Sequence, residues 1–456
     1  MPIGRRLRTL LLVLALIGAP AVALRVLCVG HSCDASEAAA QDAVPFCPLP
    51  AELRREIAAG FREGRSPDVM ASTIGASALW TRVQDDVHAP WPGAARIGGD
   101  LELPDTRVPI ALFGVGVRRR APLPDGVGLD AIAPTLEAVT GIRRDHPDVR
   151  TGTAVENVAS EGVDAPPLVV MIAWKGVGTP DLEARPDAWP FLRRAIRDGA
   201  GTLEAVTGSL PLDPAATLTT IGTGALPSSH GITGTLVRDD DGHVQRAWST
   251  REAGSVIATF ADDIDRDTAQ RSVVTGVLTD PADRGLIGDG WYLDGSDRDT
   301  VAQIGRGPDR VHSTPARLAA AMVATEGLGR DRVTDLLALV LDGTVDEVDT
   351  ASADVVGTIR ELVPDTTFAV AGTGSLRGVH RAGSARLATA IDAALQAPVV
   401  EGTSAGGFFL DGEVLVERSL SAQRVADTLR REGTSDAAPM FGDVYPSFAV
   451  AFSRYC

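Results

Sequence analysis

The apolar and polar residues of this chain follow two periods in turn, which is typical of a protein that alternates strands with helices. Apolar-rich runs suit strands that are buried on both faces of a sheet, and they fall at residues 108–113, 168–173, 272–278, 335–341 and 367–371. Amphipathic segments predict helices at residues 51–61, 129–140, 187–198, 315–325 and 350–362. This order predicts an α/β fold with a mostly parallel central sheet and helices on both of its faces.

Three further segments are predicted to lie at the margins of this sheet. Residues 66–70 suit the start of a strand, and residues 407–416 suit a hairpin outside the main sheet. Residues 445–450 favour a last strand that runs on towards Cys456. Gly141 is placed to end the helix at 129–140.

The most informative stretch is residues 209–231, which read SLPLDPAATLTTIGTGALPSSHG. Asp213 is a favourable N-cap, and Pro214 suits the first position of a helix. Residues 215–221 continue the helix, and Gly222 with Gly224 is predicted to end it. A helix start presents free N–H groups and the positive end of a dipole, so it favours an anion.

Composition narrows the class of protein. The chain has 456 residues, of which 44% are hydrophobic, and this length suffices for one large α/β domain or two ordinary ones. The formal net charge is −17, and such an excess of negative charge argues against nucleic acid as a partner.

The first residues read as an export signal. Arg5, Arg6 and Arg8 precede a short apolar core, and small residues follow near position 20, so residues 1–24 are predicted to be a signal peptide. An uncleaved N-terminal anchor is the alternative, and it would attach the protein to a membrane. Residues 25–46 have no period and are predicted to be a flexible lead-in. Export makes disulfides plausible for the four cysteines, which are Cys28, Cys33, Cys47 and Cys456.

The second half of the central stretch carries a family pattern, T-G followed by P-x-x-H-G-I. The residues that fit it are Thr223, Gly224, Pro227, His230, Gly231 and Ile232. The stretch resembles the nucleophile segment of the alkaline phosphatase superfamily, in its type I phosphodiesterase/nucleotide pyrophosphatase branch. The resemblance implies a Thr or Ser nucleophile at the helix start. That place falls at Asp213 or Pro214, and neither residue is a hydroxyl nucleophile, so no catalytic residue is assigned.

The residues at 105–110 (DTRVPI), 114–117 (GVGV) and 130–136 (DAIAPTL) resemble the part that usually ends the superfamily's domain, where the patterns are D-T-x-V-P, G-x-G-V and D-I-A-P-T-L. Here it precedes the nucleophile segment, which suggests a circular permutation. We therefore expect a permuted C-terminal portion at 47–153, a linker at 154–167 and a nucleophile-side portion at 168–456. A Cys47–Cys456 bridge would close the old junction, which leaves Cys28 to pair with Cys33.

The resemblance also implies two metal ions, usually zinc, held by carboxylates and histidines at the ends of strands. Most of the expected ligand positions carry other residues: Lys175 stands near the first Asp, Thr350 follows Asp346 where His is usual, Gly372 and Thr373 replace D-H, and Gly98 replaces the last His. Asp346 is the clear survivor, and His230 is expected to support a turn. We therefore expect no cofactor, with two zinc ions as the alternative.

Lys175 and Asp213 suggest what fills the emptied pocket, because a buried charge is costly unless it is paired. The hypothesis is an ion pair of Lys175 with Asp213 or Asp346; the alternative is that Lys175 extends to solvent. The sequence thus predicts an extracytoplasmic, non-catalytic alkaline phosphatase-like protein that binds an unknown ligand or envelope protein. Two alternatives remain: a metal-dependent phosphoester or phosphodiester hydrolase with shifted ligands, and a membrane-anchored structural domain.

Overall fold

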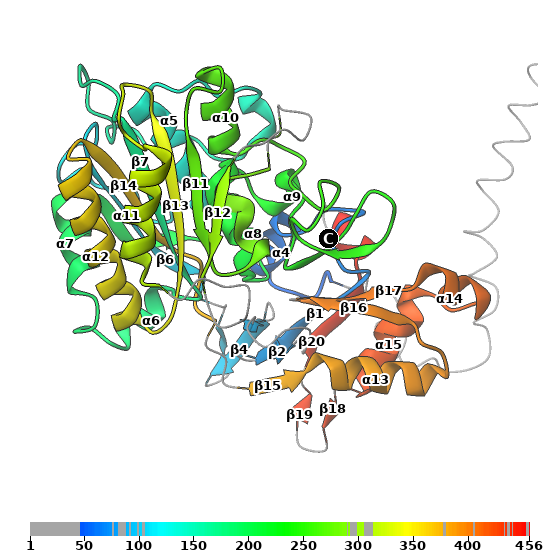
Figure 1. Cartoon of the computed structure of the whole chain (residues 1–456). Helices are drawn as coiled ribbons and strands as arrows, with labels where there is room; N and C mark the ends of the chain where they lie inside the picture. Colours follow the sequence, from blue (N-terminus) through cyan, green and yellow to red (C-terminus); the bar gives the residue numbers. More distant parts are fainter. Residues whose placement is uncertain are drawn as a thin grey trace, which may run out of the picture. The chain divides into compact units, whose positions relative to one another are not determined.

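The central sheet of the computed structural model has seven strands in the order β12-β11-β13-β7-β14-β6-β8 (Figure 1). Their bounds are β12 Thr300–Gln303, β11 Val274–Leu278, β13 Asp335–Asp342, β7 Leu168–Lys175, β14 Thr366–Gly372, β6 Arg107–Gly114 and β8 Ala200–Val206. Neighbours from β12 to β14 run parallel, and β6 is antiparallel to both β14 and β8. The predicted α/β class with a mostly parallel sheet is confirmed.

The structure describes residues 46–456 except 75–76, 81–87, 91–92, 98–99, 103–104, 290, 292–298, 305–312, 377–379, 405, 433, 436–437, 440 and 453–455. The predicted signal peptide, almost all of the lead-in, Cys28, Cys33 and Gly98 lie outside the described residues. In the part that is described, each helix is too short or too polar to cross a bilayer.

The side chains of β7 show why helices cover both faces of the sheet. Every residue of β7 is buried, and successive side chains point to opposite faces. Val169, Met171 and Ala173 belong to one hydrophobic cluster, and Val170, Ile172 and Trp174 belong to another.

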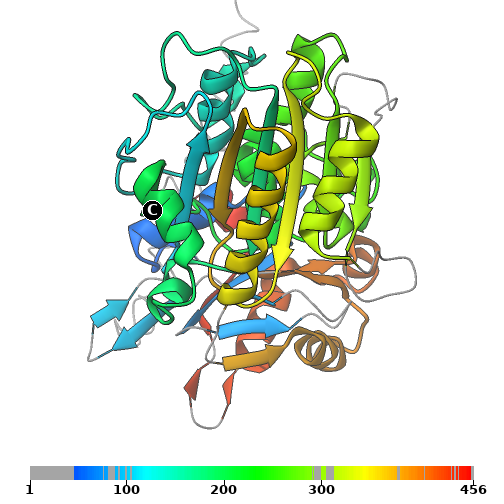
Figure 2. The same ribbon diagram turned by 60° about the vertical axis from the view of Figure 1, so that its left-hand side comes forward.

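The first cluster includes residues of α5 (Ile132–Thr140), α8 (Pro214–Thr223) and α10 (Phe260–Asp267). The second includes residues of α7 (Pro190–Asp198), α11 (Pro315–Glu326) and α12 (Val345–Leu362), and Figure 2 shows the golden-yellow α12 lying across that face. The helix predicted at 350–362 begins five residues earlier, at Val345, because Thr344 and Glu347 form a capping box there.

The segment before residue 153 belongs to the same sheet as the segment after 168. Strand β6 lies between β14 and β8, and α5 contacts α8. A buried ion pair connects the two segments, because Arg150 contacts Asp263 at 2.6 Å. Arg144 contacts Glu137 at 2.7 Å within the first segment. Arg150 also donates to the carbonyl oxygen of Thr223 at the end of α8.

A second sheet joins the front of the described chain to its end. Its path is β16-β17-β1-β4-β5, and β20 also pairs with β1. The bounds are β16 Val400–Ser404, β17 Gly407–Leu410, β1 Val69–Ile74, β4 Gly93–Ile97, β5 Asp100–Glu102 and β20 Phe441–Pro446. Helices α13 (Ser384–Leu395) and α15 (Ala422–Glu432) share its hydrophobic cluster. The Cys47–Cys456 disulfide is present, as predicted, and spans 409 residues of sequence.

The remaining elements are short. The helices are α4 Ala51–Ala59, α6 Thr179–Glu183, α9 Pro227–His230, α14 Gly412–Glu417, α16 Phe448–Ala451 and the 3₁₀ turns η1 Leu129–Ala131, η2 Pro147–Val149 and η3 Pro281–Leu286. The strands are β2 Ser77–Trp80, β3 His88–Pro90, β9 Leu236–Arg238, β10 Val244–Arg246, β15 His380–Gly383, β18 Thr434–Ser435 and β19 Ala438–Pro439.

Three local predictions are wrong. The expected hairpin at 407–416 is strand β17 followed by helix α14, because Asp411 caps that helix through the N–H groups of Glu413 and Val414. The strand expected at 445–450 ends at Pro446, and α16 follows it. Gly222 lies inside α8 rather than at its end; a Cβ there would lie 1.9 Å from the carbonyl oxygen of Gly285.

Candidate functional site

Asp213 caps helix α8, as predicted, at the place where the sequence resemblance implies a nucleophile. One carboxylate oxygen accepts the N–H of Ala215 at 2.9 Å, and the other accepts the N–H of Thr235 at 2.9 Å. The Thr235 hydroxyl also donates to this carboxylate at 3.1 Å. Asp213 is 1% exposed, and burial raises its pKa although these hydrogen bonds and Lys175 oppose the rise. The Asp213 side chain therefore stabilises the start of α8 and is buried from solvent.

The end of α8 is fixed by the T-G and H-G residues of the family pattern. Gly224 ends the helix with a positive φ of 64°, which a side chain would disfavour. His230 is fully buried; its Nδ1 accepts the N–H of Ile232 at 3.1 Å, and its Nε2 lies 3.1 Å from the Thr220 hydroxyl. Burial lowers the pKa of His230 to about 3, so the ring is neutral and supports the turn.

Lys175 ends β7 at the carboxyl edge of the sheet and is 8% exposed. Its ammonium donates to Asp283 at 2.8 Å and to the Thr279 hydroxyl at 3.2 Å. Burial alone lowers the pKa of Lys175, but the attraction of Asp283, Asp280 and Asp342 outweighs burial and raises it. Lys175 is thus a buried, protonated and paired cation.

The partner of Lys175 differs from both candidates of the sequence analysis, Asp213 and Asp346. Asp346 lies exposed in the first turn of α12, where it pairs with Arg185 at 3.5 Å. Asp283 instead belongs to η3, which packs against α8 through the close contact of Gly222 with Gly285. The predicted ion pair of Lys175 with Asp213 or Asp346 is therefore wrong in its acidic partner, which is Asp283.

Asp283 is fixed by its own turn as well as by Lys175. Its second oxygen accepts the Thr279 N–H at 3.1 Å, the Thr279 hydroxyl at 2.6 Å and the Asp280 N–H at 2.9 Å. Asp280 caps η3 through the Ala282 N–H and pairs with Arg246 of β10. Lysine, two aspartates and arginine therefore form one connected network, which we call the carboxyl-edge network (Lys175, Thr279, Asp280, Asp283 and Arg246).

The other predicted pocket residues contribute backbone shape rather than ligands. Thr373 is buried, and its hydroxyl accepts the N–H of Gly176 at 2.8 Å. A Cβ at Gly372 would lie 2.3 Å from the carbonyl oxygen of Val177, so this glycine lets β14 approach the turn after β7. Thr350 is exposed on α12.

Asp283 was missed from the sequence, although a signal was present. The residues Asp280-Pro281-Ala282-Asp283 form an N-cap, a proline at the first turn and an acidic residue at the third position, which is a capping pattern. That pattern predicts a short turn after the strand at 274–278. It does not identify a partner 108 residues earlier in the chain.

The two metal ions that the resemblance implies do not fit these residues. A lysine ammonium donates hydrogen bonds and repels a cation, and Lys175 occupies the strand end where a carboxylate ligand is expected. Its partner Asp283 already accepts four hydrogen bonds. Among the described residues, histidine, cysteine, aspartate and glutamate side chains nowhere gather in threes that could hold a metal ion.

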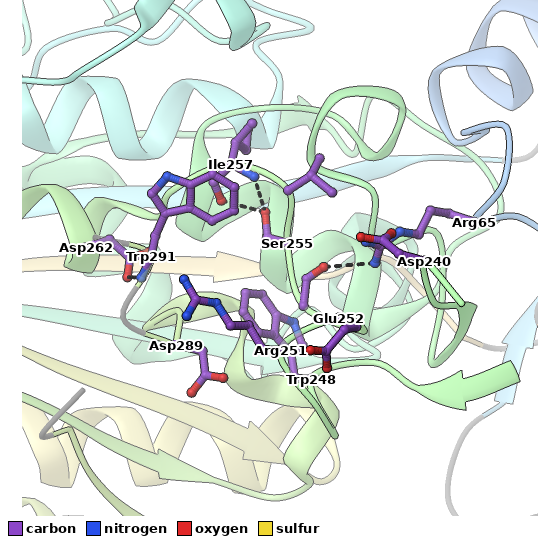
Figure 3. Close-up of a pocket in the computed structure, with 12 residues that line it drawn as sticks. Arg65, Asp240, Trp248, Arg251, Glu252, Ser255, Ile257, Asp262, Asp289 and Trp291 are labelled. Carbon is purple, nitrogen blue, oxygen red and sulfur yellow. Dashed lines mark hydrogen bonds and ion pairs between the residues drawn. The ribbon is translucent and has the colours of Figure 1, made fainter. Parts of the chain in front are cut away.

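A cavity of about 340 Å³ lies beside α8, since the indole N–H of Trp248 in its wall donates to Thr219 of that helix (Figure 3). Arg65 and Asp240 both line the cavity and form a salt bridge at 2.9 Å. Asp262, also in the lining, accepts the backbone N–H of Trp291 at 3.0 Å. Its described lining includes neither histidine nor lysine nor cysteine, so it adds none of these groups to the site.

Comparisons with known proteins agree with the sequence resemblance. Residues 169–257, which run from β7 past α9, match the model of the family described as type I phosphodiesterase/nucleotide pyrophosphatase. No curated protein matches the chain.

Two solved structures are similar in outline. The wild-type alkaline phosphatase PafA shares 15% identity at a TM-score of 0.43 over 62% of this chain and 84% of that chain. A phosphonoacetate hydrolase from Sinorhizobium meliloti 1021, in complex with phosphonoacetate, shares 14% identity at a TM-score of 0.26 over 43% and 53%. Residues 169–257 of this chain are therefore similar to the type I phosphodiesterase/nucleotide pyrophosphatase family.

Proposed function

We propose that this protein is an exported, non-catalytic member of its phosphoesterase family, which acts by binding a ligand or an envelope protein. The observation that carries the proposal is the Lys175–Asp283 ion pair, which places a buried cation where the family's chemistry needs a metal ligand. Asp213 supports the proposal as well. Its buried carboxylate caps α8 at the position where a hydroxyl group would attack phosphorus in an active enzyme.

Export is supported by the disulfide. Cys47 and Cys456 are bridged, and disulfides form and persist mainly in oxidising compartments outside the cytoplasm. The predicted signal at residues 1–24 gives the same direction. We therefore place the protein outside the cytoplasm, either secreted or held by an uncleaved N-terminus.

The permuted order belongs to the same proposal. Residues 47–153 supply β6 to the sheet that residues 168–456 otherwise build, so the two portions form one sheet. Strand β1 pairs with β20, and the disulfide closes the same end, which brings the two ends of the described chain close enough for a permutation. The residues at 154–167 would then be the new linker.

The proposal is tested on the full chain, purified from the compartment to which it is exported. We expect no stoichiometric zinc after dialysis against a zinc buffer, and no turnover of p-nitrophenyl phosphate or bis(p-nitrophenyl) phosphate above background. The Asp283→Asn variant is the control, because it alters the site without touching a contaminating phosphatase. About two zinc ions per chain, with turnover that Asp283→Asn reduces, would overturn the proposal and establish the hydrolase alternative.

If the protein is released from the membrane fraction only when detergent is added, the N-terminus anchors it to the membrane.

A further inference from the structure

A second cavity lies at the amino edge of the parallel strands, opposite the carboxyl-edge network. Its volume is about 550 Å³, and α7, α12 and the loop after β6 form its walls. Gly114 lies at its rim, where the end of antiparallel β6 meets the start of β14 at Thr367. The volume falls in the range that holds small organic ligands. We call this cavity the amino-edge groove.

Three arginines from three separate elements line the groove. They are Arg119 of the loop after β6, Arg194 of α7 and Arg360 of α12. Within the described residues, the recorded salt bridges give none of the three a carboxylate partner. The acidic residue in the lining, Asp198, is held by both nitrogens of Arg197 at 3.0 Å.

This gathering of cations is unexpected from the charge of the whole chain. The sequence has 60 acidic residues against 43 lysines and arginines, so an exposed arginine has carboxylates in excess around it. Asp198 attracts Arg119 and Asp349 attracts Arg194, without a salt bridge between them among the described residues. The three arginines concentrate positive charge at this groove in a chain that is acidic overall.

Two aromatic residues, Phe113 and Phe191, line the groove, and Phe113 packs on a third ring beneath it. Phe113 of β6 stacks on Phe368 of β14 at 5.2 Å between ring centres, and Phe191 of α7 meets Phe113 edge-on at 6.1 Å. The Arg360 guanidinium lies over Phe113 and Phe368, at 5.5 and 5.4 Å from their centres. Such an arginine keeps its N–H edge for an anion while its face rests on the rings.

Gly357 faces open space in the groove. It lies in the interior of α12, where glycine costs about 0.5–1 kcal/mol relative to alanine. A Cβ at this position would meet nothing within 4 Å, so no packing contact explains the glycine. Ala353 and Val356 line the groove on the same side of the helix, at the spacing of one helical face. The small side chains leave room for a ligand.

We propose that the amino-edge groove binds a small organic anion with an apolar body. The carboxylate, sulfonate or phosphate group would accept hydrogen bonds from Arg119 and Arg194, and the apolar part would contact Phe113, Phe191 and the face of α12. Arginine N–H groups match the oxygens of such anions in pairs, and the rings supply the apolar contact. This site is independent of the carboxyl-edge network, so either proposal can fail without the other.

The experiment titrates the full chain with 8-anilinonaphthalene-1-sulfonate, an aromatic anion whose fluorescence rises on binding. The Arg194→Glu variant should weaken binding at least tenfold. Arg418→Glu, which makes the same change of charge at the exposed residue after α14, should leave binding within twofold. Gly357→Leu should abolish binding because it fills the groove, whereas Gly357→Ala should retain it. Circular dichroism confirms that each variant is folded.

Two further probes test the anionic group and the apolar body of the ligand separately. Neutral N-phenyl-1-naphthylamine should bind at least tenfold more weakly, and inorganic phosphate should fail to displace the sulfonate probe at millimolar concentration. Equal affinity of the sulfonate for the native chain, Arg194→Glu and Gly357→Leu would overturn the proposal. Displacement by phosphate alone would overturn the apolar half of it.

Discussion

Charged side chains are paired and largely buried at one edge of the central sheet, and they are exposed at the other. At the carboxyl edge, Lys175, Asp283, Asp280 and Arg246 neutralise one another within hydrogen-bonding distance and are largely closed to solvent. At the amino edge, Arg119, Arg194 and Arg360 are exposed around an open groove. Charges that are paired and buried contribute to the fold, whereas charges that are gathered and exposed are available to a ligand. The edge at which this family is expected to react is here the edge with the more complete internal pairing.

The largest effect is expected when the buried pair is broken. The Lys175→Met variant would leave the Asp283 carboxylate buried without its cation, and such a loss costs about 3–5 kcal/mol. Arg194→Met at the other edge should change stability by about 0.5 kcal/mol or less, because Arg194 is exposed and only weakly attracted by Asp349. Urea unfolding followed by circular dichroism measures both. Equal stability of the two variants would remove the contrast between the edges.

The disulfide should come next in size. Replacing Cys47 and Cys456 by serine frees a loop of 409 residues in the unfolded chain and should cost about 2–5 kcal/mol. The loss should appear first in α4 and β20, as faster amide hydrogen exchange, while β7 and β13 stay protected. Exchange that rises equally in all four elements would show that the two sheets open together.

The buried imidazole gives a pH test. The pKa of His230 is about 3 in the folded chain and 6.5 as its reference value, so between these values the unfolded chain binds one more proton. Stability from this residue is therefore present above pH 6.5 and lost as the pH falls. The stability advantage of the native chain over His230→Gln should shrink by about 2–3 kcal/mol from pH 7.5 to pH 4.5. Two parallel stability curves would contradict this assignment of a neutral ring.

A smaller loss of stability than at the buried imidazole is expected at the helix cap. The Asp213→Thr variant restores a hydroxyl at the family's nucleophile position and keeps a side chain that can cap α8, so it should cost about 1 kcal/mol. It should hydrolyse no bis(p-nitrophenyl) phosphate, because Lys175 still occupies the pocket. Hydrolysis by this variant alone would show that the pocket accepts metal despite the lysine.

The sheet and the covering helices were predictable because a short stretch of sequence indicates each strand and each helix. Strand β7 is apolar up to Lys175 at its end, and Asp213-Pro214 and Gly224 mark the start and the end of α8. The second sheet was not foreseen, because its strands are short and its pairs join the first and last parts of the described chain, as β1 with β20. Pairing over such distances depends on the tertiary fold.

The candidate site was predictable only in part for the same reason. A lysine at the end of a buried strand requires an acidic partner, and that requirement follows from the cost of burying a charge. The choice of Asp283 among many aspartates depends on the contact of η3 with α8, which two glycines allow. Steric complementarity of that kind leaves no periodic signal in the sequence.

The most direct test is a crystal structure of the full chain grown or soaked with zinc, measured on both sides of the zinc absorption edge. The account predicts no anomalous peak among the ends of β7, β13 and β14, and an ammonium of Lys175 still within hydrogen-bonding distance of Asp283. Two zinc peaks about 4 Å apart at that edge would contradict it.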